Sequence, residues 1–262
     1  MSLLWLCLAA AAPAQDLAAI QKRGALRVIL ERHMQAERFS NEPGAEPGLE
    51  REILQGFAAL HKLRLETVVV DRTEDRMSYL VEGKGDVVVG IVVTEARRKQ
   101  AAFTSEVLPI RHVVVTRKPD PPVDTIAALR ARRVGATKGS SWAEMARQAG
   151  VPEANIDDSF AAPDSCLEAL RARKVSAVIM STAWAVVARH RDPELELGTF
   201  VGPPTTAAFA VRHAAPQLLA SLDDYVINVR RTSTWSRLVV KYFHESGLEI
   251  LKRSRPDEAA TR

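Results

Sequence analysis

Apolar positions along the chain fall into two alternating patterns. Residues 26–30 and 86–93 form almost unbroken apolar runs, which are typical of parallel strands covered on both faces. In residues 48–63 the apolar positions recur every three or four residues instead, which predicts an amphipathic helix. Strands that alternate with helices in this way predict an α/β fold with mostly parallel sheets flanked by helices.

The remaining segments continue this alternation. Residues 31–47 are polar and rich in Glu, Pro and Gly, which predicts a loop, and residues 94–99 are expected to form a turn or short helix. The pattern predicts further strands at 65–70, 133–136, 156–160, 177–180, 195–200 and 208–212. It predicts further helices at 16–24, 75–82, 123–131, 141–149, 165–173, 182–190 and 215–243, the last with a break near 232–234.

Two proline-containing segments, 118–122 and 202–205, predict two crossings between lobes. The first lobe is expected to comprise residues 17–117 and 206–245, and the second lobe residues 118–205. Two lobes joined by two connections form a hinge that can close on a ligand.

The two ends of the chain have a different character. Residues 1–14 hold a short apolar run that ends in Ala12-Pro13-Ala14, which predicts a secretory leader cleaved near Ala14 and export to the periplasm. No Lys or Arg precedes the run, and the alternative is an apolar helix turn packed on the domain. Residues 246–262 are expected to be a solvated tail.

Composition and charge argue against several classes of function. The chain has 262 residues and a net charge of +4, with basic and acidic residues interleaved, so nucleic acid is not expected as a partner. The sequence has no P-loop, G-x-G-x-x-G, G-x-S-x-G or H-E-x-x-H motif. Its two cysteines, Cys7 and Cys166, give no zinc-site spacing, so we expect neither a cofactor nor a metal.

One basic stretch lies where a ligand-binding site is expected. It is V-T-E-A-R-R-K-Q-A-A-F-T at 93–104. It follows a buried strand, and open α/β sheets bind ligands at the carboxyl ends of their strands. The planar guanidinium of Arg97 can match a carboxylate with two hydrogen bonds, and Thr94 can add a hydroxyl or cap the helix. Arg98 and Lys99 are expected to be solvated surface charges.

Five motifs in the right order resemble one known family. T-E-A-R-x-x-x-x-x-F-T at 94–104 resembles the T-x-x-R-x-x-x-x-x-F-S segment of the family 3 bacterial extracellular solute-binding proteins, the periplasmic receptors of polar amino-acid ABC transporters. The resemblance covers about residues 17–245 and implies a two-lobed, type II periplasmic-binding-protein-like fold with the ligand between the lobes. The other motifs are I-Q-K-R-G-A-L-R-V at 20–28, G-L-E-R-E-I-L at 48–54, L-R-A-R-R-V-G-A-T-K-G-S-S at 129–141 and A-F-A-V-R-H at 208–213.

The resemblance also implies which residues of the first lobe bind ligand. In this family the arginine that matches Arg97 binds the ligand α-carboxylate, and the backbone of Gly90 and the side chain of Thr94 would lie beside it. Phe39 is a candidate apolar wall, with a buried core position as the equal alternative.

In the second lobe the resemblance points to Gly139, Ser140 and Ser141, which would offer backbone N–H groups and hydroxyls at a helix N-terminus. Plain N-capping is the alternative for the two serines. Ser181 stands where amino-acid binders of the family usually have an Asp that pairs with the ligand ammonium. Glu31 is a candidate substitute for that Asp, although an exposed loop glutamate is the simpler interpretation.

The sequence therefore predicts a monomeric periplasmic substrate-binding protein of an ABC transporter. It would close around a small carboxylate-bearing solute, an amino acid or related organic acid, and deliver it to an inner-membrane permease. Two alternatives on the same fold stay open, a dehydratase of the cyclohexadienyl type with Glu31 or Glu106 as general acid and a ligand-sensing module. The regulatory domain of membrane-bound lytic transglycosylases shares the fold, but their catalytic domain would have to follow residue 245.

Overall fold

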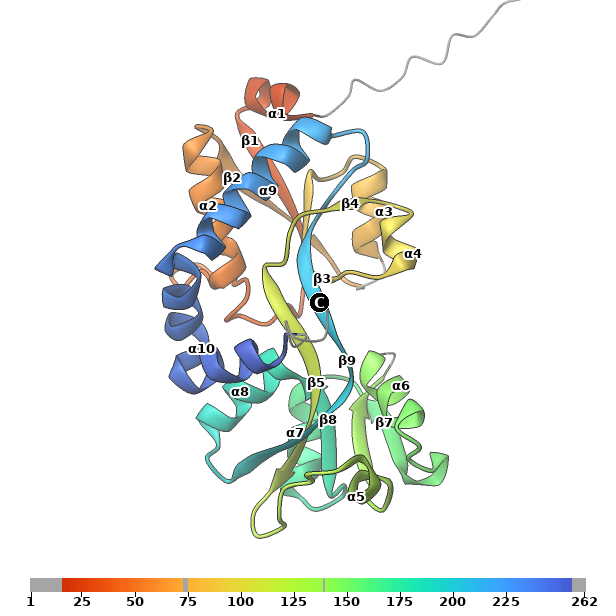
Figure 1. Cartoon of the computed structure of the whole chain (residues 1–262). Coiled ribbons are helices and arrows are strands. Elements are labelled where there is room, and N and C mark those ends of the chain that lie inside the picture. Colours follow the sequence, from red (N-terminus) through yellow and green to blue (C-terminus); the bar gives the residue numbers. More distant parts are fainter. Residues whose placement is uncertain (1–15, 73–74, 139, 256–262) are drawn as a thin grey trace, which may run out of the picture.

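The computed structural model describes residues 16–72, 75–138 and 140–255. Its strands form one mixed sheet in the order β2-β1-β3-β9-β5-β8-β6-β7, with β4 paired to β9 (Figure 1). The strands are β1 (Ala25–Glu31), β2 (Arg64–Val70), β3 (Val87–Val92), β4 (Ala102–Phe103), β5 (Leu108–Arg117), β6 (Val134–Thr137), β7 (Ile156–Phe160), β8 (Ala177–Ser181) and β9 (Leu195–Val211).

Helices cover this sheet, and they follow the apolar periodicity of the sequence closely. They are α1 (Leu17–Arg23), α2 (Leu49–Leu60), α3 (Asp75–Val81), α4 (Glu95–Arg98), α5 (Ile126–Arg130), α6 (Ser141–Gln148), α7 (Pro163–Arg171), α8 (Thr182–Arg191), α9 (Pro216–Arg231) and α10 (Ser233–Arg253), with a 3-10 turn at Glu153–Asn155. In the first lobe, α2 and α9 lie on one side of the sheet and α3 and α4 on the other (Figure 1).

Two long antiparallel strands, β5 and β9, are shared by both lobes (Figure 1). On β5, Leu108 and Ile110 belong to the apolar cluster of the first lobe, whereas Val113 belongs to that of the second. On β9, Val201 packs in the second cluster and Phe209 in the first. The two-lobed α/β architecture is confirmed, but its sheet is mixed, because the strands that connect the lobes run antiparallel to their neighbours.

The crossings lie inside these strands and differ from the predicted linkers. Strand β5 was not predicted at all, and the first crossing falls between Ile110 and Val113, ahead of the predicted boundary at residue 117. The segment predicted as the first linker, 118–122, is instead a connection between β5 and α5 at the outer end of the second lobe. It is held there by a backbone hydrogen bond from Lys118 N to Glu194 O at 2.9 Å.

The second predicted linker is a bulge within one continuous strand. The β5–β9 register passes from Ile110 opposite Thr205 to His112 opposite Val201, so β9 holds two extra residues at this point. The bulge contains Gly202, whose φ is 71°, and two prolines that have no N–H to give to a ladder. This is why the sequence pattern gave two strands where the structure has one.

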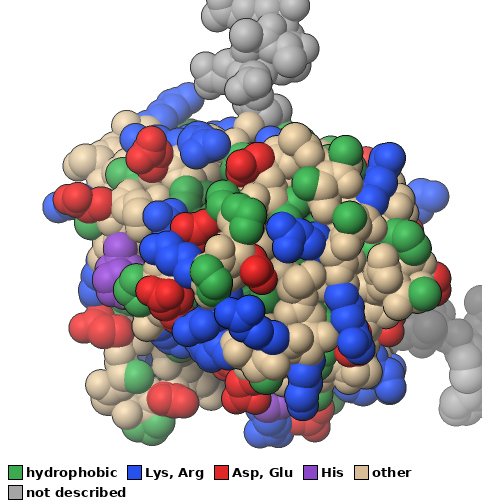
Figure 2. Space-filling view, turned by 90° about the horizontal axis from the view of Figure 1, so that it is seen from below, with side chains coloured by type: hydrophobic (Ala, Val, Ile, Leu, Met, Phe, Trp, Pro, Cys, Tyr) green, Lys and Arg blue, Asp and Glu red, His purple; other side chains and the backbone are tan. Residues whose placement is uncertain are grey.

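The outer face of the second lobe carries charges of both signs. Figure 2 shows blue and red side chains interspersed over this face. Some are paired across neighbouring elements, as in the contacts of Arg147 with Glu153 at 2.8 Å and with Asp158 at 2.9 Å. Within the described ranges, no helix combines the length and apolar character that a bilayer crossing requires.

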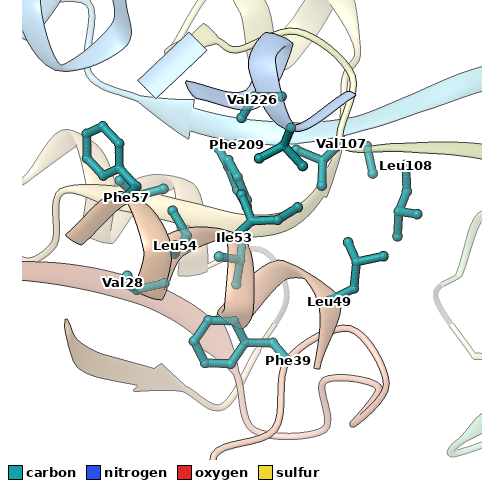
Figure 3. Packing of buried hydrophobic residues seen from close by; sticks show 14 of the residues in the cluster. Val28, Phe39, Leu49, Ile53, Leu54, Phe57, Val107, Leu108, Phe209 and Val226 are labelled. Carbon is teal, nitrogen blue, oxygen red and sulfur yellow. The ribbon is translucent and has the colours of Figure 1, made fainter. Parts of the chain in front are cut away.

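The core of the first lobe forms where α2 and α9 meet the sheet. Ile53 and Phe57 of α2 are buried on the face that the helical spacing predicts, and they pack with Phe209 of β9 (Figure 3). Phe39 belongs to the same cluster, with 1% of its surface exposed. Of the two alternatives for Phe39, the structure shows the core position, because its ring fills the core of the first lobe.

The C-terminal helix continues past the predicted end of the fold. Helix α10 bends at His244, whose φ is 63°, and runs on to Arg253. Leu251 is fully buried in the core of the first lobe, and the ring of His244 stacks on that of His190 in α8 with 3.4 Å between centroids. The expected solvated tail from residue 246 is thus wrong as far as Ser254, since this segment packs against α8 beside the shared strands.

Replacing Leu251 by alanine tests this packing. Removal of a buried leucine side chain leaves a cavity, and we expect the free energy of unfolding to fall by about 2–4 kcal/mol. Lys252→Ala is the matched control, because Lys252 is exposed in the same helical turn. Urea denaturation of both variants measures the effect, and equal midpoints for the two would mean that this end of α10 is not part of the folded core.

Candidate ligand-binding site

Arg97 lies just after the carboxyl end of β3, as expected, on the single turn of α4. Thr94 caps this turn, its Oγ1 accepting a hydrogen bond from Arg97 N at 3.3 Å. The half-buried Arg97 side chain folds back, so that Nη1 donates to Val92 O at 2.7 Å. Burial lowers the pKa of Arg97 and the carboxylate of Glu31 raises it, yet a guanidinium stays charged at any physiological pH. A fixed cation thus stands at the carboxyl end of a central strand.

Glu31 lies at the carboxyl end of β1, next to β3 in the sheet, and faces two arginines. Its Oε2 lies 3.8 Å from Nη2 of Arg76 on α3, and its charge also acts on Arg97. Arg76 is buried, and its Nη1 donates to Val89 O at 3.1 Å. Glu31 is therefore a half-buried member of a charge cluster, and its negative charge is already balanced by arginine.

Gly90 lies on β3, and its N–H group is already engaged. It donates to Oε2 of Glu50 at 2.6 Å, and Glu50, which is 1% exposed, accepts a second bond from Nε of Arg38 at 2.6 Å. Gly90 has a φ of 63°, and a Cβ there would lie 2.2 Å from Cε of Met34. The N–H is thus used within the protein, and the expected ligand contact through the Gly90 backbone stays a prediction. The glycine allows the close approach of the loop after β1.

These groups form one electrostatic unit that we call the first-lobe charge cluster: Arg38, Arg76, Arg97, Glu31 and Glu50. The charges of all four other members act on Arg76. Burial lowers the pKa of Arg76, as do Arg97 and Arg38, while Glu31 and Glu50 raise it. Among these five described side chains, three are cations and two are anions.

The second-lobe candidates stand at the carboxyl ends of β6 and β8. Ser140 caps α6, since its Oγ accepts from Trp142 N at 3.2 Å and donates to Thr137 O at 2.6 Å. The capping interpretation therefore accounts for Ser140. Ser141 is exposed as the first residue of α6, and Gly139 lies outside the described residues.

The structure adds one residue that the sequence did not single out, His112 on β5. Its Nε2 lies 3.0 Å from Oγ of Ser141, and its Cα is paired with that of Ser181 across β5 and β8. Residues directly opposite in an antiparallel pair place their side chains on the same face of the sheet. Because β5 was not predicted, no sequence pattern could have placed His112 between these two serines.

The strand ends of both lobes face the junction between the lobes. In Figure 1, α4 lies on the lower side of the first lobe and α6 on the upper side of the second, so Arg97 and Ser141 are carried on facing ends. Phe39 lies in the core of the first lobe, apart from the candidate residues at these facing ends. In the part of the chain that the structure describes, no three His, Cys, Asp or Glu side chains gather as metal ligands would.

Comparison with known proteins agrees with this geometry. A family model described as bacterial extracellular solute-binding proteins, family 3, matches residues 26–245. Curated relatives include the membrane-bound lytic murein transglycosylase F of Stutzerimonas stutzeri (strain A1501), 26% identical over 87% of this chain and 48% of the relative, and that of Pseudomonas syringae pv. tomato, 24% identical over 86% and 46%. The chain therefore spans about half the length of the curated relatives it matches.

Solved structures show the same fold. An arginine-binding protein (ArgBP) mutant from T. maritima has a TM-score of 0.71 at 22% identity and covers 87% of this chain and 99% of its own. An ancestral arginine-binding protein bound to arginine has a TM-score of 0.68 at 24% identity, with coverage of 84% and 99%. An ancestral cationic amino acid solute-binding protein has a TM-score of 0.75 at 18% identity, with coverage of 86% and 98%. These likenesses confirm the type II periplasmic-binding fold.

The buried His112 gives the folded chain a testable dependence on pH. Burial lowers its pKa from 6.5 to about 4, so the unfolded chain binds a proton between these values that the folded chain does not. We therefore expect the contribution of His112 to the free energy of unfolding to be fully present above pH 6.5. This contribution is lost, by roughly 3 kcal/mol, as the pH drops towards 4.

Urea denaturation of the native chain and His112→Gln at a series of pH values measures this effect. Burial and His190 also lower the pKa of His244, but His244 is present in both proteins, so the difference between the two curves reports His112. Parallel curves would show that His112 titrates alike in the folded and unfolded chains.

Proposed function

Because the chain belongs to the family 3 bacterial extracellular solute-binding proteins, we propose that it binds a small carboxylate-bearing solute between its two lobes. The observation that carries this proposal is the half-buried Arg97 guanidinium, whose bond from Nη1 to Val92 O holds it at the carboxyl end of β3. A guanidinium has five N–H donors in a planar fork, and this geometry matches a carboxylate. The ligand is an amino acid or a related organic acid, since the similar solved structures include proteins bound to arginine.

Closure of the lobes would complete the site. The ligand carboxylate binds Arg97 in the first lobe and Ser141 at the N-terminus of α6 in the second, and Ser181 contacts the other end of the ligand. Bending at the bulge of β9 and the matching stretch of β5 would bring the two sets together. A ligand that contacts both lobes stabilises the closed form by its differential affinity for the two states.

In the cell, the chain would act as an exported, monomeric receptor that delivers its solute to an inner-membrane ABC permease. Residues 1–14, the proposed leader, lie outside the described residues. A permease and an ATPase encoded beside this chain would support transport, whereas a neighbouring histidine kinase would support ligand sensing instead.

The curated relatives favour a second candidate, ligand sensing within murein metabolism. They are named as murein transglycosylases, and the match covers about half of each. Murein peptides carry carboxylates and could use the same arginine, so they belong in a ligand screen.

A dehydratase receives less support from the site. Of the two acids that could serve as general acid, Glu106 is held by Arg230 at 3.1 Å and by Arg255 at 3.1 Å. Glu31 lies 3.8 Å from Arg76, so both acids are already engaged by arginines within the protein.

A thermal-shift screen of the leader-free chain tests the proposed function directly. The panel comprises amino acids, 2-oxo acids, dicarboxylates and murein peptides. A ligand present at 100 times its Kd adds about 2.7 kcal/mol to stability, which gives a clear rise in Tm. The absence of any shift across the carboxylates would argue against the proposed ligand class.

Arg97→Ala is expected to weaken binding of whichever acid the screen identifies. Loss of a charge-assisted pair to a carboxylate costs about 2–5 kcal/mol, which is at least thirtyfold in Kd. Arg98→Ala is the matched control, because Arg98 is exposed on the same turn and its guanidinium lies 5.9 Å from the ring centroid of Phe103. Isothermal titration calorimetry measures both variants, and equal affinities would remove Arg97 from the site.

A further inference from the structure

A small cavity lies at the outer end of the second lobe, away from the strand ends that carry Arg97 and Ser141. It is lined by the β5–α5 connection and by the end of α7 with the segment that leads to β8, and its volume is about 100 Å³. Leu170 and Val175, both buried, give it an apolar wall. A space of this size holds a few waters or one small ion, so this cavity is a feature separate from the proposed solute site.

Three of the four charged side chains that line this cavity are basic. Arg117 ends β5, Lys118 follows it, and Arg173 follows α7. The one acid is Asp120, whose backbone N–H donates to Arg117 O at 3.1 Å. This bond and that of Lys118 N to Glu194 O fix the backbone of the β5–α5 connection, so the charged side chains start from defined positions.

Arg117 has a buried donor without an acceptor. Its Nε is buried and makes no hydrogen bond within the part of the chain that the structure describes. Oδ2 of Asp192 lies 4.0 Å from this nitrogen, beyond hydrogen-bond distance, and already accepts from Nε of Arg171 at 2.9 Å. A buried polar atom in this state points to a bound water or ion.

The other charged groups of the cavity are also available to a ligand. The side chains of Lys118, Asp120 and Arg173 make no hydrogen bond or ion pair with any other described residue. An oxyanion in the cavity would therefore bind cations that no carboxylate of the described chain already holds. Arg and Lys are the side chains that proteins most often use to bind such ions.

Arg173 occupies a position where stability alone favours glycine. It follows the C-cap of α7 with a φ of 56°, and its N–H donates to Leu170 O at 3.1 Å. Glycine is the usual residue in this left-handed conformation, because a Cβ is strained there. A cation near the end of α7 also suits the helix dipole, but the next residue, Lys174, already supplies one. The arginine side chain is thus kept beside the cavity at some cost in stability.

Asp120 makes the cavity selective among anions. An ionised carboxylate only accepts hydrogen bonds, so it repels an anion unless that anion offers a donor. Hydrogen phosphate has a P–OH group that can donate to the carboxylate, while its other oxygens accept from the basic side chains. Sulfate has the same tetrahedral shape but carries no proton near neutral pH.

We propose that this cavity is a binding site for inorganic phosphate in its hydrogen phosphate form. Arg117, Lys118 and Arg173 donate to the unprotonated oxygens, and Asp120 accepts the hydrogen bond of the P–OH group. The site lies at the outer end of the second lobe, so it does not depend on which solute the two lobes enclose.

Calorimetric titration of the full chain in phosphate-free buffer at pH 8 and constant ionic strength tests the proposal. The probes are inorganic phosphate, sulfate and methyl phosphate, which has lost its last proton at this pH because its second pKa is about 6. We expect inorganic phosphate to bind about tenfold more tightly than the other two, since only it can donate to Asp120. Equal binding of all three anions would show a general attraction to basic surface, and no binding of phosphate would show a cavity filled by water; either result overturns the proposal.

Two neighbouring residues give a matched pair of variants. Arg173→Gln and Lys174→Gln each remove one positive charge, but only Arg173 lines the cavity, and Lys174 is exposed beside it. We expect Arg173→Gln to weaken phosphate binding about three- to tenfold and Lys174→Gln to change it by less than about twofold. Arg173→Gly should lose as much affinity while it keeps the fold, because glycine adopts the positive φ without strain. Equal affinities of the Arg173 and Lys174 variants would overturn the site.

Asp120→Asn tests the selectivity. An amide can donate a hydrogen bond, so this variant should bind sulfate more tightly than the native chain does and lose most of the preference for phosphate. An unchanged preference would overturn the assignment of hydrogen phosphate.

Arg97→Ala keeps this site apart from the solute site. It should leave phosphate binding unchanged, because Arg97 lies in the other lobe. Loss of phosphate binding in Arg97→Ala would place the anion at the solute site and overturn the inference, while the proposed function would stand.

Discussion

The pairing of β5 with β9 is the constraint on which the rest of the structure depends. These two antiparallel strands are the central strands of the sheet, and each carries residues of both apolar cores. The ladder shifts register twice, between Ile110 and His112 and between Val113 and Val115, and the larger shift holds Gly202 and two prolines. Backbone bending is easiest where ladder bonds are missing, and the larger shift lies between the two apolar cores.

The same sheet brings the ionic groups of the first lobe together. Neighbouring strands β1 and β3 end side by side, so Glu31 and Arg97 meet although 66 positions separate them in the chain. Glu50 of α2 connects two parts of this region, because its carboxylate accepts hydrogen bonds from Arg38 and from the N–H of Gly90. Buried charges are tolerated when they are paired and hydrogen-bonded, as Glu50 is here.

In the second lobe two serines and a histidine lie near the carboxyl ends of β6 and β8. Ser140 is used to cap α6, which leaves Ser141 as the exposed hydroxyl, and the buried ring of His112 contacts it from the central strand. Burial holds His112 neutral, because desolvation lowers its pKa.

The sequence by itself determined the elements whose signals are local. Apolar runs located β1 and β3, the capping serine located α6, and the T-E-A-R segment placed Arg97 on a turn at a strand end. Only the tertiary structure decided the rest. Strand β5 mixes valines with Pro109, Arg111 and His112, and it becomes a central strand because β8 and β9, which follow much later in the chain, cover both of its edges. The burial of Leu251, the core position of Phe39 and the contact of His112 with Ser141 likewise arise from packing between distant segments, which no local pattern records.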